Sequence, residues 1–103
     1  MRDQVAKRKS SRCPAHPGIL LRETIDATGR TKTEIAELLG LSRQHLYAIM
    51  DGMKPVSPNV AIKLGKLFGN GGGLWLRMQA AYDLWHAERE VDISAIPTIG
   101  AAG

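Results

Sequence analysis

The sequence predicts an all-α fold in which five helices form a single small domain. Apolar residues recur three and four positions apart, which is the spacing of a helix face, and no alternating strand pattern competes. They make up 44% of the 103 residues while aromatic residues make up only 5%, a balance that suits a helical core of Leu, Ile and Ala. Four glycines each follow an apolar-periodic stretch, as C-terminal helix caps do. They are Gly29, Gly40, Gly52 and Gly69.

The first two helices are expected over 17–28 and 32–39. Pro17 lies in the first turn of the first helix, which stops before Gly29. The second begins with a capping box, in which the Thr31 hydroxyl accepts a hydrogen bond from a backbone N–H while the Glu34 carboxylate reaches back. Their inward apolar residues are expected to be Leu20, Leu21, Ile25, Ile35, Leu38 and Leu39.

Three further helices are expected downstream. Ser42 is the N-cap of a helix that runs to about Asp51, and Ser57 followed by Pro58 opens the next. Residues 69–73, Gly-Asn-Gly-Gly-Gly, are interpreted as a flexible connector before a long helix over about 74–90. The buried side chains of the two shorter helices are expected to be Leu46, Ile49, Val60, Ala61, Leu64 and either Leu67 or Phe68.

The stretch 31–51 predicts a helix-turn-helix unit, in which two short helices cross steeply. Ala36 is small where the helices approach, Gly40 suits a left-handed turn, and Leu41 fills the corner. The wedge between the helices would be filled by Ile35, Leu46 and Ile49. The alternative is an ordinary helical hairpin with a solvated outer surface.

With this inner face fixed, the N-terminal end of the second helix is the part that would enter a DNA major groove. Arg43 can bond guanine and Gln44 can bond adenine, each with two hydrogen bonds. Ser42 and Lys32 would hold phosphates, while Tyr47 either contacts DNA or packs on its own helix. The candidate DNA-binding residues are Thr31, Lys32, Ser42, Arg43, Gln44, His45 and Tyr47.

The helix over 74–90 has more apolar surface than one amphipathic stripe needs. One side carries Trp75, Met78, Tyr82 and Trp85, which we expect to form the interface of a homodimer. The other side carries Leu76, Ala80, Leu84 and Ala87. One side can pack on the domain and leave the other for a second copy; alternatively both sides are buried within one chain.

Charge is concentrated at the N-terminus. Five basic residues and one acidic residue within 1–12 account for the whole net charge of +4. Residues 1–15 are therefore interpreted as a basic flexible tail, which is a DNA-backbone arm, a toxin-binding segment or a solvated end. Residues 16–90 form the domain, and 91–103 a loosely ordered C-terminal tail in which Val91, Ile93 and Ile96 are candidates to cover a partner surface.

Other classes of function find little support. Cys13 and His16 supply only two zinc ligands, so no metal or other cofactor is expected. The glycines of 69–73 lack the lysine and Ser/Thr of a phosphate-binding loop. Because no catalytic motif is found either, the protein is not expected to be an enzyme. No membrane span, secretion signal or internal disulfide is expected, which points to a cytoplasmic protein.

Three separated motifs resemble the HigA antitoxin family, a branch of the phage-repressor-like helix-turn-helix proteins. They are His16-Pro17-Gly18 with Leu21-Arg22-Glu23, then Ser42-Arg43-Gln44, then the run Trp75-Leu-x-x-Gln-x-x-Tyr-Asp83. The resemblance covers the chain from His16 to Ala87. Departures are Lys32 in place of a usual glutamine, Ile19 in place of an acidic residue, Arg30 in place of an apolar one, and Gly71–Gly73 in place of a Ser-Pro helix start.

The resemblance implies two activities. Members of the family neutralise a RelE/HigB-like mRNA-cleaving toxin by direct binding, and as homodimers they repress their own operon by binding a pseudo-palindromic operator DNA. Two alternatives remain: a free-standing helix-turn-helix transcriptional repressor without a toxin partner, and a helical interaction module that has lost DNA binding.

Overall fold

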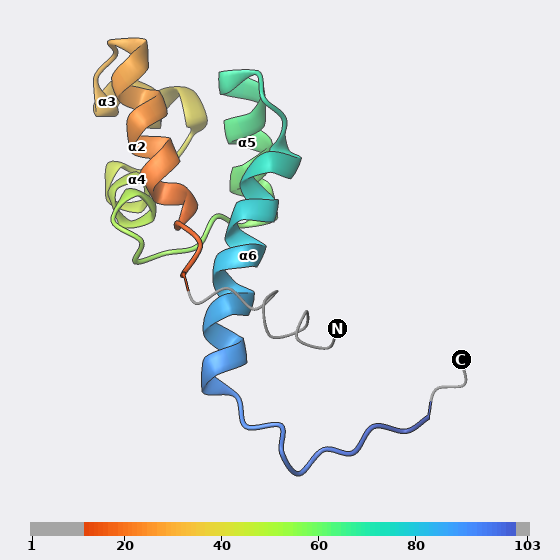
Figure 1. Cartoon of the computed structure of the whole chain (residues 1–103). Coiled ribbons are helices and arrows are strands. Elements are labelled where there is room, and N and C mark those ends of the chain that lie inside the picture. Colours follow the sequence, from red (N-terminus) through yellow and green to blue (C-terminus); the bar gives the residue numbers. More distant parts are fainter. Residues whose placement is uncertain (1–11, 101–103) are drawn as a thin grey trace.

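The computed structural model describes residues 12–100, and within them the chain forms five helices and no strand (Figure 1). This confirms the predicted all-α fold. Most of the boundaries agree with the sequence prediction to within a residue. The helices are α2 (Pro17–Thr28), α3 (Lys32–Leu39), α4 (Arg43–Met50), α5 (Pro58–Phe68) and α6 (Gly72–Glu90).

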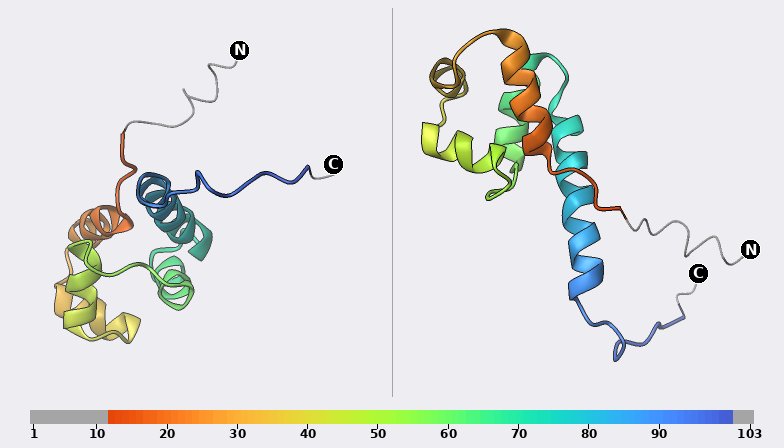
Figure 2. Two further views of the ribbon diagram at one scale, coloured as in Figure 1. Left: turned by 90° about the horizontal axis from the view of Figure 1, so that it is seen from below. Right: turned by 60° about the vertical axis from the view of Figure 1, so that its left-hand side comes forward.

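The helices fall into two groups. Helices α2, α3 and α4 lie together on one side, while α5 and the long α6 pack alongside each other on the other (Figure 2). The C-terminal half of α6 continues past the ends of the other helices (Figure 1). Residues 91–100 then run away from the domain, exposed and without helix. The expected N-terminal tail lies, for residues 1–11, outside the described residues.

Local capping explains where the helices begin. The Thr31 hydroxyl accepts from the Glu34 N–H at 3.1 Å, and the Glu34 carboxylate accepts from the Thr31 N–H at 2.9 Å. This second bond keeps the pKa of Glu34 below its ordinary value, because it favours the charged carboxylate. The Ser42 and Ser57 hydroxyls also cap α4 and α5, by accepting from the His45 and Val60 N–H groups at 3.0 and 3.2 Å, without a reciprocal carboxylate. The predicted capping box is therefore confirmed.

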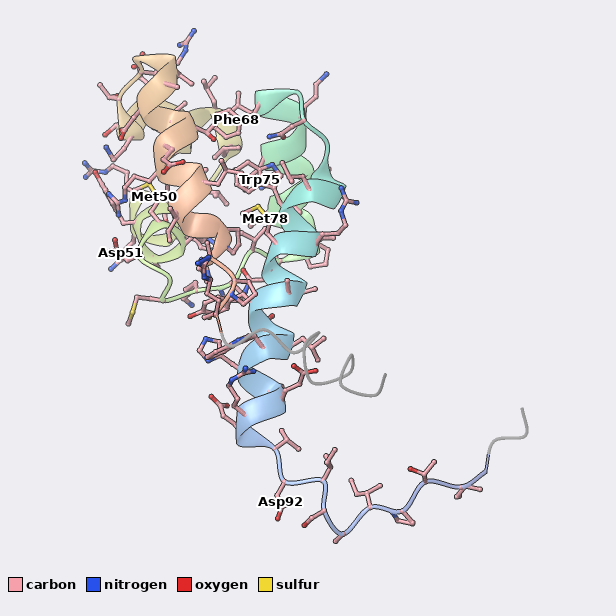
Figure 3. All side chains as sticks on the ribbon, viewed as in Figure 1. Met50, Asp51, Phe68, Trp75, Met78 and Asp92 are labelled. Atoms are coloured by element: carbon pink, nitrogen blue, oxygen red, sulfur yellow. The ribbon has the colours of Figure 1, made fainter. Side chains whose placement is uncertain are left out.

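The core joins all five helices. Trp75 of α6 is fully buried and points into the domain (Figure 3). The other buried apolar side chains are Leu21, Ile25, Ile35, Ala36, Leu39, Leu46, Ile49, Met50, Val56, Val60, Ala61 and Leu64. Leu20, Leu41, Leu67 and Phe68 pack against them. Leu38, which we expected to face inward, is 57% exposed. Because α3 has only two turns, Ile35, Ala36 and Leu39 already cover the core, and Leu38 lies beside that face.

Helix α6 begins earlier than the sequence suggests, and its glycines do more than provide a flexible connector. A Cβ placed on Gly65 of α5 would lie 2.3 Å from backbone atoms of Gly71 and Gly72. The Gly71 N–H also donates to the Gly65 carbonyl at 3.2 Å. The two segments thus touch backbone to backbone. Glycine's poor helix propensity predicted a start near residue 74, but this contact fixes the start at Gly72.

Helix α6 does not divide into one packed side and one free side as we expected, because Leu76 of the second side also packs against the core. Trp75 lies in the core of its own chain, and the Tyr82 ring packs against His16 and His86 at 4.9 and 4.5 Å between ring centroids. Met78 and Trp85 are half-buried. On the other side Leu84 is 60% exposed. The expected set Trp75, Met78, Tyr82 and Trp85 therefore does not form a free face. The alternative, in which both sides are buried in one chain, is also wrong.

His16 links three parts of the domain. Its Nδ1 accepts a hydrogen bond from the Gly18 N–H at 2.9 Å and so caps α2, and its ring packs edge-on against Tyr82 of α6. Burial lowers the pKa of His16 because it penalises the charged imidazolium. The nearby Asp83 carboxylate and a hydrogen bond to the Lys54 backbone partly oppose this shift. The neutral ring is thus the form that the fold prefers.

The lowered pKa of His16 makes stability depend on pH. The unfolded chain binds a proton here near pH 6.5, whereas the folded chain binds it only at lower pH. The free energy of unfolding should therefore be highest above pH 6.5 and fall as the pH drops through 6.5 toward the folded pKa. We expect His16→Asn, whose amide oxygen can still accept from Gly18, to lack this component in urea unfolding measured at several pH values. An identical pH dependence in the two proteins would contradict the assignment.

Candidate nucleic-acid interface

The position of α4 is fixed by the turn that joins it to α3. Gly40 adopts φ 70°, a left-handed backbone conformation that residues with a side chain rarely take. The Leu41 N–H donates to the Ala36 carbonyl at 2.9 Å. Ala36 is only 1% exposed, as expected for a small residue at the crossing. At the other end of α4, Arg22 of α2 forms an ion pair of 2.7 Å with Asp51. Both ends of the helix are thereby attached to neighbours.

The outward face of α4 presents the side chains that the sequence predicted there. Ser42, Arg43 and Gln44 are exposed at its N-terminal end, and Tyr47 is 41% exposed one turn further on. His45 and the neighbouring Ala48 are half-buried. The expected exposure of the helix is confirmed, and contact of these residues with DNA stays a prediction. The arrangement offers a guanidinium and an amide side by side, which is suitable for hydrogen bonds to base edges.

The two candidates at the start of α3 are already engaged within the chain. The Thr31 hydroxyl accepts from Glu34 N–H and also lies 3.3 Å from its carboxylate. Lys32 Nζ lies 3.6 Å from the Asp26 carboxylate, and the Lys32 side chain is 30% exposed. At that distance the pair is weak and can be exchanged for a phosphate. Lys32 thus stays a reasonable phosphate ligand, whereas the Thr31 side chain is committed to its capping role.

Lys54 is a candidate that the sequence prediction missed. It follows α4 in the segment 51–57 and lines one hollow of about 460 Å³ together with four residues of α4 and its N-cap. These are Ser42, Gln44, His45 and Ala48. An exposed lysine beside this face adds a positive charge within reach of a DNA backbone. The signal in the sequence was a lone basic residue in a short loop, which does not reveal its position relative to α4.

The part of the chain between residues 12 and 100 contains no group of three or more His, Cys, Asp or Glu side chains arranged to hold a metal ion. Cys13 Sγ lies 3.6 Å from Nε2 of His86, which is on α6. None of the described helices is long and apolar enough to cross a membrane.

Comparisons with known proteins agree with this geometry. A family model described as helix-turn-helix matches residues 21–73. Virulence-associated protein A′ of Dichelobacter nodosus is 40% identical over 72 residues, which cover 69% of this chain and 63% of that protein. Antitoxin HigA-1 of Vibrio cholerae is 37% identical over 79 residues, which cover 76% of this chain and 74% of that protein.

A solved structure has the same arrangement of helices. It is an addiction module antidote protein of a HigA family from Coxiella burnetii, with a TM-score of 0.75 and 27% sequence identity. The superposition covers 85% of this chain and 99% of that one. The helices beyond the helix-turn-helix unit are therefore shared as well.

Proposed function

The chain belongs to the helix-turn-helix family that includes the HigA antitoxins, and on that premise we propose that it is the antitoxin of a type II toxin–antitoxin module. In this proposal it binds and neutralises a RelE/HigB-like mRNA-cleaving toxin, and as a dimer it represses its own operon. Both activities belong in the cytoplasm. The antitoxin and antidote names of its relatives support the first activity, and the surface of α4 supports the second.

One observation carries the proposed DNA contact: Arg43 and Gln44 are exposed together at the N-terminal end of α4, a helix whose two ends are attached to the domain. In this position Arg43 would bond guanine O6 and N7, and Gln44 would bond adenine N6 and N7. Ser42 and Lys32 would bind phosphates and set the register, and Lys54 would add a phosphate contact beside the outer face of α4. His45 and Tyr47 lie beside this set as further candidates.

The proposed dimer uses the side of α6 that the domain leaves uncovered. Leu84, Ala87 and Glu88 of α6 line a mostly apolar hollow with Val91 and Ile93, which follow the helix, and Leu84, Val91 and Ile93 are 58–65% exposed. A twofold arrangement would pack this patch against its own copy, because an isologous interface pairs the same surface of both chains. The two α4 helices would then bind successive major grooves, about 34 Å apart on a pseudo-palindromic operator.

Arg43→Ala tests the proposed base contact. We expect it to weaken binding to the specific operator by about 1–3 kcal/mol and to reduce the preference over random duplex, because a bidentate base contact is lost. Fluorescence anisotropy with both duplexes measures this. Arg77→Ala, an equal loss of charge on the exposed surface of α6, is the control and should retain the preference. Unchanged affinities of Arg43→Ala for both duplexes would disprove the contact.

Leu84→Glu tests the proposed dimer. A carboxylate at the centre of an apolar interface should shift the protein to monomers, since burying an unpaired charge is costly. Sedimentation equilibrium measures the change, and Ile62→Glu, which alters an exposed aliphatic residue on α5, should leave the dimer intact. A wild-type monomer, or a Leu84→Glu dimer as tight as the wild type, would rule out this interface.

Co-expression tests the antitoxin activity itself. The protein encoded by the reading frame beside this gene should co-purify with the chain, and its cleavage of mRNA should stop when the complex forms. If the neighbour neither binds the chain nor arrests growth when expressed alone, the chain is a free-standing repressor. Failure of operator binding as well would leave only the interaction module.

A further inference from the structure

Gln79 of α6 makes contacts that a surface helix does not need. It is 5% exposed, and with His16 it is one of two buried polar side chains within residues 12–100. Its Oε1 accepts a hydrogen bond from the Val56 N–H at 2.7 Å, and its Nε2 donates to the Asp83 carboxylate at 2.9 Å. Since a buried amide is costly unless it is bonded, both bonds hold Gln79 in one orientation. That orientation is aimed at the segment 51–57.

The segment 51–57 is attached at both of its ends. Near α4, the Met53 and Lys54 N–H groups both donate to the Ala48 carbonyl, at 2.8 and 3.2 Å. Near α5, Val56 is bonded to Gln79 and its side chain is 2% exposed. Lys54 thus belongs to the attachment near α4 and lies two residues before Val56, which bonds to α6. The residue between them, Pro55, has a restricted φ and transmits the constraint along the backbone.

His16 lies beside the segment 51–57 as well. A Cβ placed on Gly52 would lie 3.8 Å from its ring, and the Lys54 backbone is close enough to raise the pKa of His16. Asp83, which orients the Gln79 amide, also acts electrostatically on His16. His16, Gln79 and Asp83 therefore form one polar cluster between α6 and the segment that carries Lys54.

We infer that Gln79 is a positioning residue for DNA binding: by holding the Val56 N–H it fixes the segment 51–57, so that Lys54 stays beside the outer face of α4, where it binds a DNA phosphate. This inference rests on the proposed operator binding. It assigns a DNA-directed role to α6, which contributes no side chain to the hollow beside α4. The competing explanation is that Gln79 only stabilises the fold.

A double-mutant cycle separates the two explanations. Gln79→Met, Lys54→Met and the double variant are compared with wild type as full-length proteins, on a duplex covering the region upstream of the chain's own reading frame. Affinities are measured at several salt concentrations, at a temperature at which circular dichroism shows every variant to be folded. Met approximates the length of both side chains but makes none of their hydrogen bonds.

If Gln79 acts through Lys54, each single variant weakens binding and lowers the slope of log affinity against log salt, by about one for Lys54→Met. When Lys54 is already Met, adding Gln79→Met should alter the affinity by less than about twofold. The reason is that the Lys54–phosphate contact, which Gln79 positions, is already lost. An equal loss in both backgrounds, or no loss for Gln79→Met alone, would overturn the inference.

Two more variants keep the test decisive. Asp83 is exposed, and Asp83→Ala removes the acceptor that orients the Gln79 amide. This variant should lower the affinity and the salt slope as Gln79→Met does, but by a smaller factor. This variant replaces Gln79→Met if the latter does not fold. Asn70→Ala is the control. It removes the 3.0 Å bond between Asn70 and the indole of Trp75, which is on α6 like Gln79, and it should keep the wild-type salt slope.

If Asn70→Ala lowers the slope as much as Gln79→Met does, general destabilisation explains the effect and the inference fails. If the wild-type protein binds the upstream duplex no better than a random duplex of equal length, the proposed function fails rather than the inference about Gln79.

Discussion

The left-handed turn at Gly40 is the constraint on which the candidate interface depends. It reverses the chain within a few residues, and the Leu41 bond to the Ala36 carbonyl holds α4 across α3. With the inner face of α4 buried at Leu46 and Ile49, the outward face has no freedom to rotate. The exposure of Arg43 and Gln44 is thus a consequence of how the backbone turns, rather than of the two side chains themselves.

Helix α6 provides the second level of organisation. Its Trp75 completes the core, and its polar residues bind the loop that follows α4. The motif that first suggested the family, Trp75 to Asp83, is therefore explained by contacts within one chain: the indole bonds Asn70, Gln79 bonds Val56, and the Tyr82 ring packs on His16. Helix α6 thus contributes both to the core and to the position of the segment beside α4.

Much of the fold could be predicted because its signals are local. A capping box, a serine before a proline, and glycines after apolar stretches specify helix ends by contacts over three or four residues. The outward face of α4 could be predicted from the helical spacing of the apolar residues within α4 itself. The roles of the two sides of α6 could not be predicted, because both are apolar and only the tertiary packing decides which side meets the domain.

The other misses have the same origin. Lys54 acquires its position from its bond to Ala48 and from the bond of Val56 to Gln79, a partner that is 23 residues from Val56 in the sequence. Leu38 has the spacing of a core residue but lies on a helix too short to need it. The early start of α6 depends on a tertiary contact at Gly65 that opposes the intrinsic preference of glycine. In each case the deciding partner lies outside the local window.

The backbone contact of Gly65 with Gly71 and Gly72 also bears on how such a protein can evolve. Two helices that meet through side chains can change their mutual angle as those side chains are replaced, but helices that meet through main-chain atoms cannot. The angle at which α6 leaves the domain is therefore insulated from drift in the rest of the core. If α6 sets the geometry of a pair of protomers, conservation of these three glycines would preserve the distance between two operator half-sites. Substitutions in α4 could meanwhile change which bases each half-site contains.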